Sequence, residues 1–166
     1  MDSENGRRQD ETRVWIQVLR IHGRIFGELN RSMLEKTGIS VTKFDALAQL
    51  YRYPEGLTMS ALSQALRVTN GNVSGLVARL IRDGLVVRHM SSTDRRSFTA
   101  CMTPKGKHTF EQALTVHDAV LAECLGQLSP EKLHAAAGLL REVSACLRPT
   151  KEPQEDADDH LARRPA

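Results

Sequence analysis

The sequence predicts a mainly α-helical fold with one small β-hairpin, because two kinds of periodicity occur along it. Apolar residues recur at three- and four-residue steps before residue 84 and again after residue 103, as in amphipathic helices. Between these regions, two short β-prone runs flank a polar loop. The 166 residues suffice for one domain with a modest core and additional helices, but not for two large independent domains.

The first helix is expected from Asp10 to about Glu35, after a flexible start at residues 1–9. Gly38 ends it, since glycine tolerates the left-handed turn that follows a last helical turn. At 1.5 Å per residue the helix is about 39 Å long, and its apolar stripe exceeds what one small domain can cover. We therefore expect residues 10–39 to form a dimerisation helix. The stripe contains Trp15, Val18, Leu19, His22, Ile25, Phe26, Leu29 and Met33.

Three shorter helices are predicted next. Ser40 and Thr58 can cap the first two, and the first of them stops before Pro54 because proline disfavours helix in the residue before it. A turn at residues 67–69 leads to the third, which runs from about Asn70 to Asp83. Their apolar sides are Phe44, Leu47, Ala48, Leu50 and Tyr51, then Met59, Leu62 and Leu66, and finally Val73, Leu76, Val77 and Leu80.

The period then changes to that of strands. Gly84 stops the preceding helix, and residues 85–90 and 97–102 are β-prone. The loop at residues 91–96 between them contains turn-forming Ser and Asp together with two arginines. This pattern predicts a hairpin with a charged tip.

Two further helices are indicated by the pairs Thr103-Pro104 and Ser129-Pro130. In each pair a capping hydroxyl precedes proline at the first helical position, where the missing N–H costs nothing. We expect residues 104–148 to form C-terminal dimerisation helices whose apolar stripes pack on one side. The last segment, residues 149–166, is rich in Pro, Asp and Glu and is expected to be disordered.

A helix, a short turn, a second helix and a hairpin in this order predict a winged helix-turn-helix over residues 40–103. In this arrangement the second helix enters the major groove of DNA and the hairpin reaches along the backbone. Gly71 and Gly75 add no bulk at the start of that helix, although each costs an exposed helix about 1 kcal/mol relative to alanine. This favours close approach to DNA over the alternative, in which the polar residues only cap and expose the first turn. The candidate DNA contacts here are Thr69, Asn70, Asn72 and Ser74.

Basic residues concentrate around the hairpin. From Arg79 to Lys107 the chain has seven Lys and Arg against two Asp, a net charge of +5 within a total of +3. Such a concentration indicates a surface for a polyanion, since a solvated face usually mixes both signs. Arginine at a hairpin tip also suits the negative potential of a narrow minor groove. We therefore add Arg79, Arg95 and Arg96 to the DNA-binding candidates, and we expect Asp94 to hold the shape of the tip by pairing with a neighbouring arginine.

Three motifs occur in order between Ser40 and Lys107. They are Leu76-Val77-Ala78-Arg79-Leu80-Ile81-Arg82-Asp83-Gly84-Leu85-Val86-Val87-Arg88, Asp94-Arg95-Arg96-Ser97 and Thr103-Pro104-Lys105-Gly106. Their order and spacing resemble the MarR family of bacterial winged-helix transcriptional regulators, and the flanking helices extend the resemblance to about residues 10–147. It implies a homodimer that binds a pseudo-palindrome in double-stranded DNA, with Arg96 entering the minor groove. Met102 replaces the family's usual leucine, a swap that conserves volume.

The same resemblance implies that a small ligand, often an aromatic carboxylate or phenol, alters DNA affinity by binding between the dimerising helices and the winged helix. The sequence from Asn70 to Leu85, which begins Asn-Gly-Asn-Val-Ser-Gly-Leu, is similar to a branch that responds to aromatic acyl-CoA thioesters, so we expect a repressor released by such an effector. The alternative for His22, and for His117 on a later stripe, is a satisfied residue in an apolar contact. The ligand-binding candidates are Trp15, His22, Phe26 and Tyr51, with Arg13, Arg20 and Arg24 for CoA phosphates.

Cysteine and histidine patterns argue against redox and metal sensing. Cys101, Cys124 and Cys146 are odd in number and lack CxxC spacing, so we interpret them as reduced, buried and inert thiols. The family's peroxide sensors carry a cysteine near the start of the first helix, where this chain has none. The six histidines include no HxxxH pair, and neither a metal nor another cofactor is expected.

An enzyme is not expected, because the chain has no HExxH, no GxSxG, no glycine-rich phosphate loop and no carboxylate pair on an apolar face. The remaining alternative is a helical dimer that acts as a protein interaction module without specific DNA binding. No apolar run approaches the roughly 20 residues that span a bilayer, and the start lacks the apolar stretch of a signal peptide. A cytoplasmic protein without a membrane partner is the resulting expectation.

Overall fold

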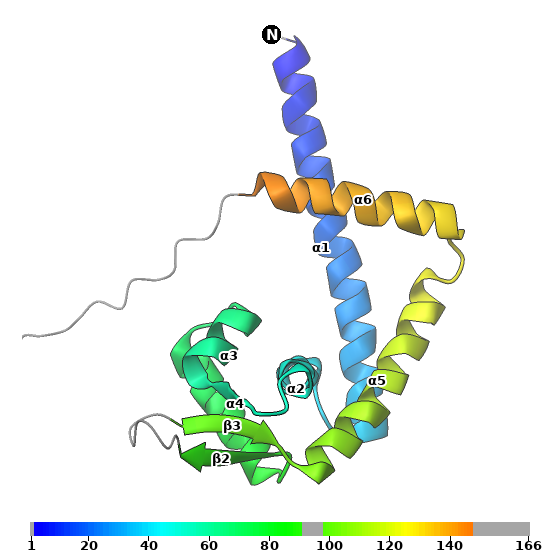
Figure 1. Ribbon diagram of the computed structural model, residues 1–166. Coiled ribbons are helices and arrows are strands. Elements are labelled where there is room, and N and C mark those ends of the chain that lie inside the picture. Colours follow the sequence, from blue (N-terminus) through cyan, green and yellow to red (C-terminus); the bar gives the residue numbers. More distant parts are fainter. Residues whose placement is uncertain (1, 91–97, 148–166) are drawn as a thin grey trace, which may run out of the picture. The chain divides into compact units, whose positions relative to one another are not determined.

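The computed structural model describes residues 2–90 and 98–147 of the chain. Its elements are α1 (Asp2–Thr37), α2 (Val41–Arg52), β1 (Leu57–Thr58), α3 (Met59–Leu66), α4 (Asn70–Arg82), β2 (Val86–Met90), β3 (Phe98–Met102), α5 (Pro104–Leu125) and α6 (Pro130–Cys146) (Figure 1). A mostly helical chain with a small antiparallel sheet confirms the predicted fold class. The hairpin loop at residues 91–96 and the tail at residues 149–166 lie outside the described residues.

Helix α1 begins earlier than the sequence predicts. Residues 2–9 are helical, so the predicted flexible start at residues 1–9 is wrong over this stretch. Oppositely charged side chains one turn apart support the extension, as where Arg7 Nε donates to Glu11 Oε1 at 3.0 Å. The helix ends where predicted, because Gly38 adopts a φ of +72° and donates its N–H to the Leu34 carbonyl.

The helix-turn-helix is delimited by the predicted hydroxyl caps. The first N–H groups are accepted by the cap side chains, Lys43 N by Ser40 Oγ at 3.4 Å, Ala61 N by Thr58 Oγ1 at 3.2 Å and Asn72 N by Thr69 Oγ1 at 3.5 Å. Between α3 and α4, Arg67 takes the left-handed conformation with a φ of +55°, and its N–H donates to the Gln64 carbonyl. The chain thus reverses within three residues without a glycine.

The hydrophobic core lies among α1, α2, α3, α4, α5 and the sheet. The apolar side predicted for α4 is buried in full, since none of its four residues exceeds an exposed fraction of 4%. Only the second half of the α1 stripe joins this core, through Leu29 and Met33, while Trp15 in the first half is 60% exposed. Residues at the centre are Met33, Leu47, Leu50, Leu62, Val73, Val77, Leu80 and Val86.

The sheet has three strands in the order β1-β3-β2, one more than the sequence predicts. β1 is only two residues long, too short to show a strand period, and it pairs with β3 through Leu57 opposite Ala100. Gly56, with a φ of +86°, makes this pairing feasible because a side chain there would collide with Cys101 and the Ala100 carbonyl. β2 and β3 form the predicted hairpin, with Val86 opposite Met102.

Three consecutive residues, Asp83, Gly84 and Leu85, connect α4 to the sheet and to the start of α5, and we call them the α4–wing junction. Lys43 on α2 forms an ion pair with the Asp83 carboxylate at 2.6 Å. Thr103 Oγ1 donates to the Gly84 carbonyl at 2.8 Å, and Thr103 N donates to the Leu85 carbonyl at 3.0 Å. The end of α4, the base of the hairpin and the first turn of α5 are therefore fixed to one another.

The chain divides into two compact units, residues 1–127 and 128–166. In the second unit the structure describes α6, which begins at the predicted cap Ser129 and contains no buried residue. Its apolar side chains are largely exposed, Leu139 at 63% and Leu140 at 56% among them. No helix in the described part of the chain is both long and apolar enough to cross a bilayer.

Gly106→Ala is expected to lower the free energy of unfolding by about 1–3 kcal/mol, because the added methyl group would overlap the Leu85 carbonyl in the α4–wing junction. Chemical denaturation measures the change. Gly27→Ala is the matched control, since nothing lies within 4 Å of a methyl group at that exposed helical position. It should raise stability by up to about 1 kcal/mol, and equal behaviour of the two variants would contradict the role assigned to the junction.

Candidate nucleic-acid interface

The first half of α4 presents a polar face to solvent. Four predicted DNA contacts lie there together with Gly71, and each of these five residues is exposed. The intervening Val73, Leu76 and Val77 are buried, so the helix is anchored by its opposite side. We call this exposed set the α4 polar face. It consists of Thr69, Asn70, Gly71, Asn72 and Ser74.

Internal packing does not require the glycines of this helix. A methyl group at Gly71 would meet no atom within 4 Å, and one at Gly75 would meet only the Arg79 guanidinium at 3.7 Å. Capping explains Thr69, whose hydroxyl accepts the Asn72 N–H, but it does not explain two residues that weaken an exposed helix. The absence of side chains at these two positions allows a binding partner to approach the helix backbone closely.

The basic residues of the wing region differ in what they contact. Arg79 and Arg82 are exposed on the last turns of α4. Lys105 donates to the Asp83 carbonyl at 2.8 Å, so this part of the predicted positive surface belongs to the α4–wing junction. The Arg88 guanidinium lies 4.0 Å from the centroid of the Phe98 ring.

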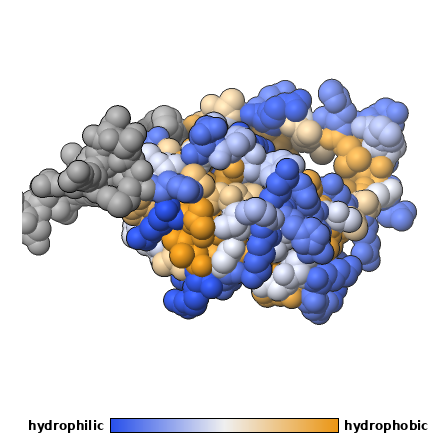
Figure 2. Space-filling view, turned by 60° about the horizontal axis from the view of Figure 1, so that its bottom comes forward, coloured by the Kyte–Doolittle hydropathy of each residue, from blue (hydrophilic) through white to orange (hydrophobic). Residues whose placement is uncertain are grey.

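The predicted wing-tip residues fall in the loop that the structure leaves out. Arg95 and Arg96, the DNA-binding candidates, and Asp94, the predicted shape-holding residue, lie outside the described residues. Figure 2 views the molecule from the end at which α5 begins, and hydrophilic side chains predominate on that face, with smaller apolar patches between them.

The predicted ligand-binding residues form two groups. His22 and Phe26 stack on each other along α1, with ring centroids 5.4 Å apart, and Trp15 is exposed nearer the amino terminus of the same helix. Tyr51 instead pairs with Phe110 on α5 at 4.8 Å. In the described part of the chain the structure thus brings two of the four candidates into contact and places Tyr51 in a different cluster.

That second cluster, which the sequence did not single out, is a column of four rings between α2 and α5. The rings are Tyr51, Phe110, Phe44 and His117 in this order, with centroid separations of 4.8, 5.3 and 5.2 Å. We call it the aromatic column. Phe110 and His117 share one stripe of α5, which was a visible signal, but their partners on α2 depend on how the two helices pack. His117 therefore makes an apolar stacking contact, in line with the alternative weighed above.

The polar surroundings of His117 couple the column to two carboxylates. Its Nδ1 lies 3.0 Å from Asp118 Oδ1. On α2, partial burial raises the pKa of the Asp45 carboxyl, and the nearby His117 partly offsets this increase. An ionised Asp45 is therefore less favourable in the folded chain than in water.

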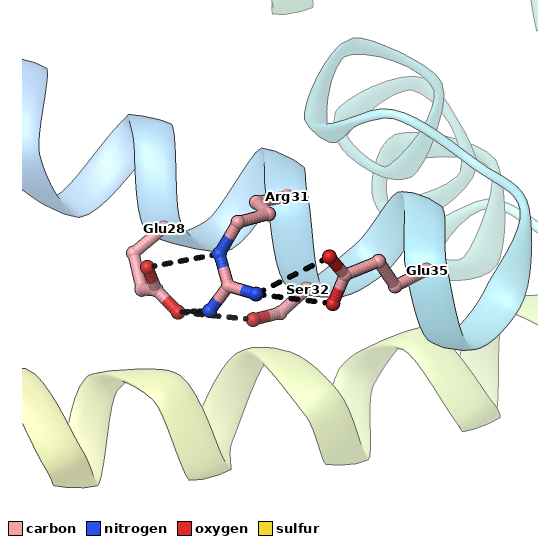
Figure 3. A network of polar contacts seen from close by, with 4 residues as sticks. All are labelled: Glu28, Arg31, Ser32 and Glu35. Carbon is pink, nitrogen blue, oxygen red and sulfur yellow. Dashed lines mark hydrogen bonds and ion pairs between the residues drawn. The ribbon is translucent and has the colours of Figure 1, made fainter.

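A second polar group lies on α1, where Arg31 is bracketed by two carboxylates (Figure 3). Glu28 and Glu35 each accept hydrogen bonds from its guanidinium, and Ser32 Oγ, in a buried residue, contacts Glu28 at 3.3 Å. The hydrogen bond from Arg31 lowers the pKa of Glu28 and raises that of Arg31. These exposed pairs favour helix along this stretch of α1, as pairs one turn apart generally do.

The three cysteines differ from the prediction that all are buried. Cys101 is half-buried and its thiol donates to the Glu55 carbonyl at 3.4 Å, while burial and then the Glu55 charge raise its pKa. Cys124 on α5 and Cys146 at the end of α6 are both exposed in the single chain. Among the described residues, no three metal-binding side chains gather into a candidate site.

A helix-turn-helix whose second helix has one buried and one polar face, followed by a β-hairpin, defines the winged-helix class of nucleic-acid-binding proteins. The model of the MarR family matches residues 37–97. A crystal structure of a MarR family transcriptional regulator from Silicibacter pomeroyi is 47% identical and superposes with a TM-score of 0.74 over 86% of this chain and 98% of that one. The chain belongs to the MarR family of transcriptional regulators.

Two more distant structures share the fold. Sco3205, a MarR family regulator from Streptomyces coelicolor solved in complex with DNA, is 23% identical with a TM-score of 0.76 over 87% of this chain and 92% of its own. CouR from Rhodococcus jostii RHA1, solved with bound p-coumaroyl-CoA, is 21% identical with a TM-score of 0.70 over 82% of this chain and 95% of its own.

Asp45→Asn is expected to stabilise the protein at neutral pH but not in acid. Because the folded state raises the pKa of Asp45, the wild type loses stability as the pH rises from the unfolded value of about 3.9 through the folded pKa. The asparagine variant has no such loss, so its advantage should grow across that interval and then level off. Urea denaturation at a series of pH values measures it.

Asp118→Asn is the matched control, since it removes the carboxylate next to His117 Nδ1 and should show no gain at neutral pH. An Asp45→Asn advantage that is independent of pH would contradict the burial argument.

Proposed function

We propose that the chain is a homodimeric repressor that binds a pseudo-palindromic operator and is released from it by a small aromatic ligand or its CoA thioester. The observation that carries the DNA-binding part is the α4 polar face. Its opposite side is locked into the core, and its glycines lower helix stability without any internal packing reason. A helix surface without bulky side chains allows the DNA to come close to the helix backbone.

In this proposal the recognition helix reads bases and the wing follows the backbone. Asparagine can bond adenine edges in the major groove, and hydroxyls can bond bases or phosphates. Sco3205 supports the assignment as a protein of the same fold solved on DNA. The proposed contacts are Thr69, Asn70, Asn72, Ser74 and Arg79 from α4, and Arg95 and Arg96 from the wing, with Asp94 shaping its tip.

The proposed partner of α1 and α6 is a second copy of this chain. The first half of α1 and the whole of α6 leave large apolar side chains exposed, including Trp15 at 60% and Leu139 at 63%. Surfaces of this type are costly in water and are typical of interfaces. A symmetric pair also presents two recognition helices, which can enter successive major grooves about 34 Å apart. Residues 10–39 and 104–148 serve this dimerisation.

For the effector we propose an aromatic acid or its CoA ester, bound near His22 and Phe26. Their stacked rings offer an apolar platform, and CouR supports the ligand class as a regulator of this fold that binds p-coumaroyl-CoA. Of the three arginines proposed for the CoA phosphates, Arg13 is already paired with Asp10 at 2.9 Å, which leaves Arg20 and Arg24 as the better candidates. A hundredfold loss of operator affinity requires about 2.7 kcal/mol of coupling, within reach of one ligand per subunit.

Selection of bound duplexes from a random DNA library by the purified protein tests the DNA-binding part. We expect a pseudo-palindromic sequence whose affinity falls steeply and linearly with the logarithm of salt concentration, because phosphate contacts release counterions. Size determination should give a dimer. A protein that enriches no sequence and retains DNA only weakly at low salt would support the protein interaction module instead, and a monomer would exclude the symmetric arrangement.

Gly71→Ala separates folding from DNA binding. The methyl group fits without contact in the chain, so the free energy of unfolding should rise by up to about 1 kcal/mol. Affinity for the selected duplex should nevertheless fall, by about tenfold or more, because the group would stand between the helix and the DNA. Gly6→Ala provides the same chemical change at an exposed position of α1, outside the segment proposed for dimerisation, and should leave DNA affinity unchanged. Unchanged affinity in Gly71→Ala would remove the close approach from the proposal.

Thermal-shift screening of phenolic acids and their CoA esters, with and without the selected duplex, tests the effector part. One compound should raise the unfolding temperature of the free protein and release it from DNA. Phe26→Ala should weaken this response by a larger factor than it changes the affinity for the duplex in the absence of ligand. A compound that acts equally on Phe26→Ala would place the ligand elsewhere.

A further inference from the structure

Arg88, a basic residue on β2, is held in place by an aromatic side chain of the neighbouring strand. Arg88 lies on β2 opposite Ala100, and its guanidinium carbon sits 4.0 Å from the centroid of the Phe98 ring on β3. Phe98 is half-buried and Arg88 is exposed, so the ring is part of the sheet while the cation remains at the surface. A guanidinium over an aromatic face at this distance forms a cation–π contact.

The strand register places this pair on the side of the sheet that faces the helices. Alternate residues of a strand share a face, which groups Arg88 with Val86 and groups Phe98 with Ala100. Val86 and Ala100 are 1% and 0% exposed, so their face is the one packed against the core, to which α4 also belongs. Arg88 and Phe98 extend that same face outward, beyond the core and towards the wing tip.

This position has a consequence for a winged helix on DNA. When α4 occupies a major groove and the wing tip reaches the next minor groove, the sugar-phosphate strand that separates the two grooves passes between helix and wing. The wing surface turned towards α4 is therefore the one that meets that strand. From this placement we propose that Arg88, positioned by Phe98, is a phosphate-binding residue of the wing; the inference rests on the DNA-binding function proposed above.

The stacked geometry is compatible with this role because it occupies only the face of the guanidinium. The N–H donors lie in the plane and point outward from its edge, where they can bond a phosphate with two parallel hydrogen bonds. Arginine combines both contacts because it is planar and delocalised, whereas the lysine ammonium cannot stack in this way. Phe98 lowers the conformational freedom that Arg88 would otherwise lose on binding.

Salt titrations of DNA affinity with the selected duplex test the proposal. Arg88→Ala should weaken binding by about tenfold per subunit, equally for the preferred sequence and its single-base variants. It should also reduce the slope of log affinity against log salt by about 0.9 per subunit, or about 1.8 per dimer. Arg88→Lys should keep the wild-type slope.

Phe98→Leu isolates the positioning role, since it keeps the charge and removes the ring. It should weaken binding by about two- to fivefold per subunit without a change in the salt slope. Arg8→Ala is the matched control, because it removes the same charge from an exposed position on α1 and should alter the slope far less. Denaturation curves of every variant show whether the fold is intact.

The outcomes are distinct. If the wild type selects a duplex but Arg88→Ala keeps its salt slope, the phosphate contact is overturned, whatever happens to stability. If Phe98→Leu binds as tightly as the wild type, the positioning role is overturned. If the wild type binds no duplex, the DNA-binding function itself fails.

Discussion

The α4–wing junction is the constraint on which the rest of the molecule depends. DNA offers its grooves at fixed separations, so a helix and a hairpin that enter neighbouring grooves must keep a fixed relation. The Asp83 carboxylate accepts a hydrogen bond from Lys43 on α2, and the Asp83 carbonyl accepts one from Lys105 on α5. Gly84, with a φ of +73°, turns the chain, and Gly106 allows the first turn of α5 to lie against Leu85. The end of α4, the start of β2 and the first turn of α5 meet at this one place.

Helix α4 combines two opposing requirements. Its buried side supplies part of the hydrophobic core, which holds the helix in place from behind. Gly71 on its exposed side and the half-buried Gly75 lower the stability of the helix, and burial of the other side offsets that loss. Without its buried face the helix would not remain folded, since isolated helices of this length are marginal in water.

The aromatic column links the DNA-binding part of the chain to the helices proposed for dimerisation. Phe44 and Tyr51 belong to α2, and Phe110 and His117 belong to α5. Each of the three stacking contacts in the column therefore joins α2 to α5. Any change in the angle between α5 and α2 requires these rings to repack. Closely packed side chains have few alternative arrangements, so the column fixes how α2 packs against α5.

Apart from the start of α1, the sequence by itself determined the helices, their caps and the two strands of the hairpin, because hydroxyl caps, Gly38, Gly84 and apolar periodicity act over a few residues. It also determined the buried and polar sides of α4. Only the tertiary structure decided the two-residue strand β1, the pairing of Lys43 with Asp83 and the stacking of Arg88 on Phe98. These contacts join residues that are distant in the chain or that follow from strand register, and no local pattern encodes which partners packing will bring together.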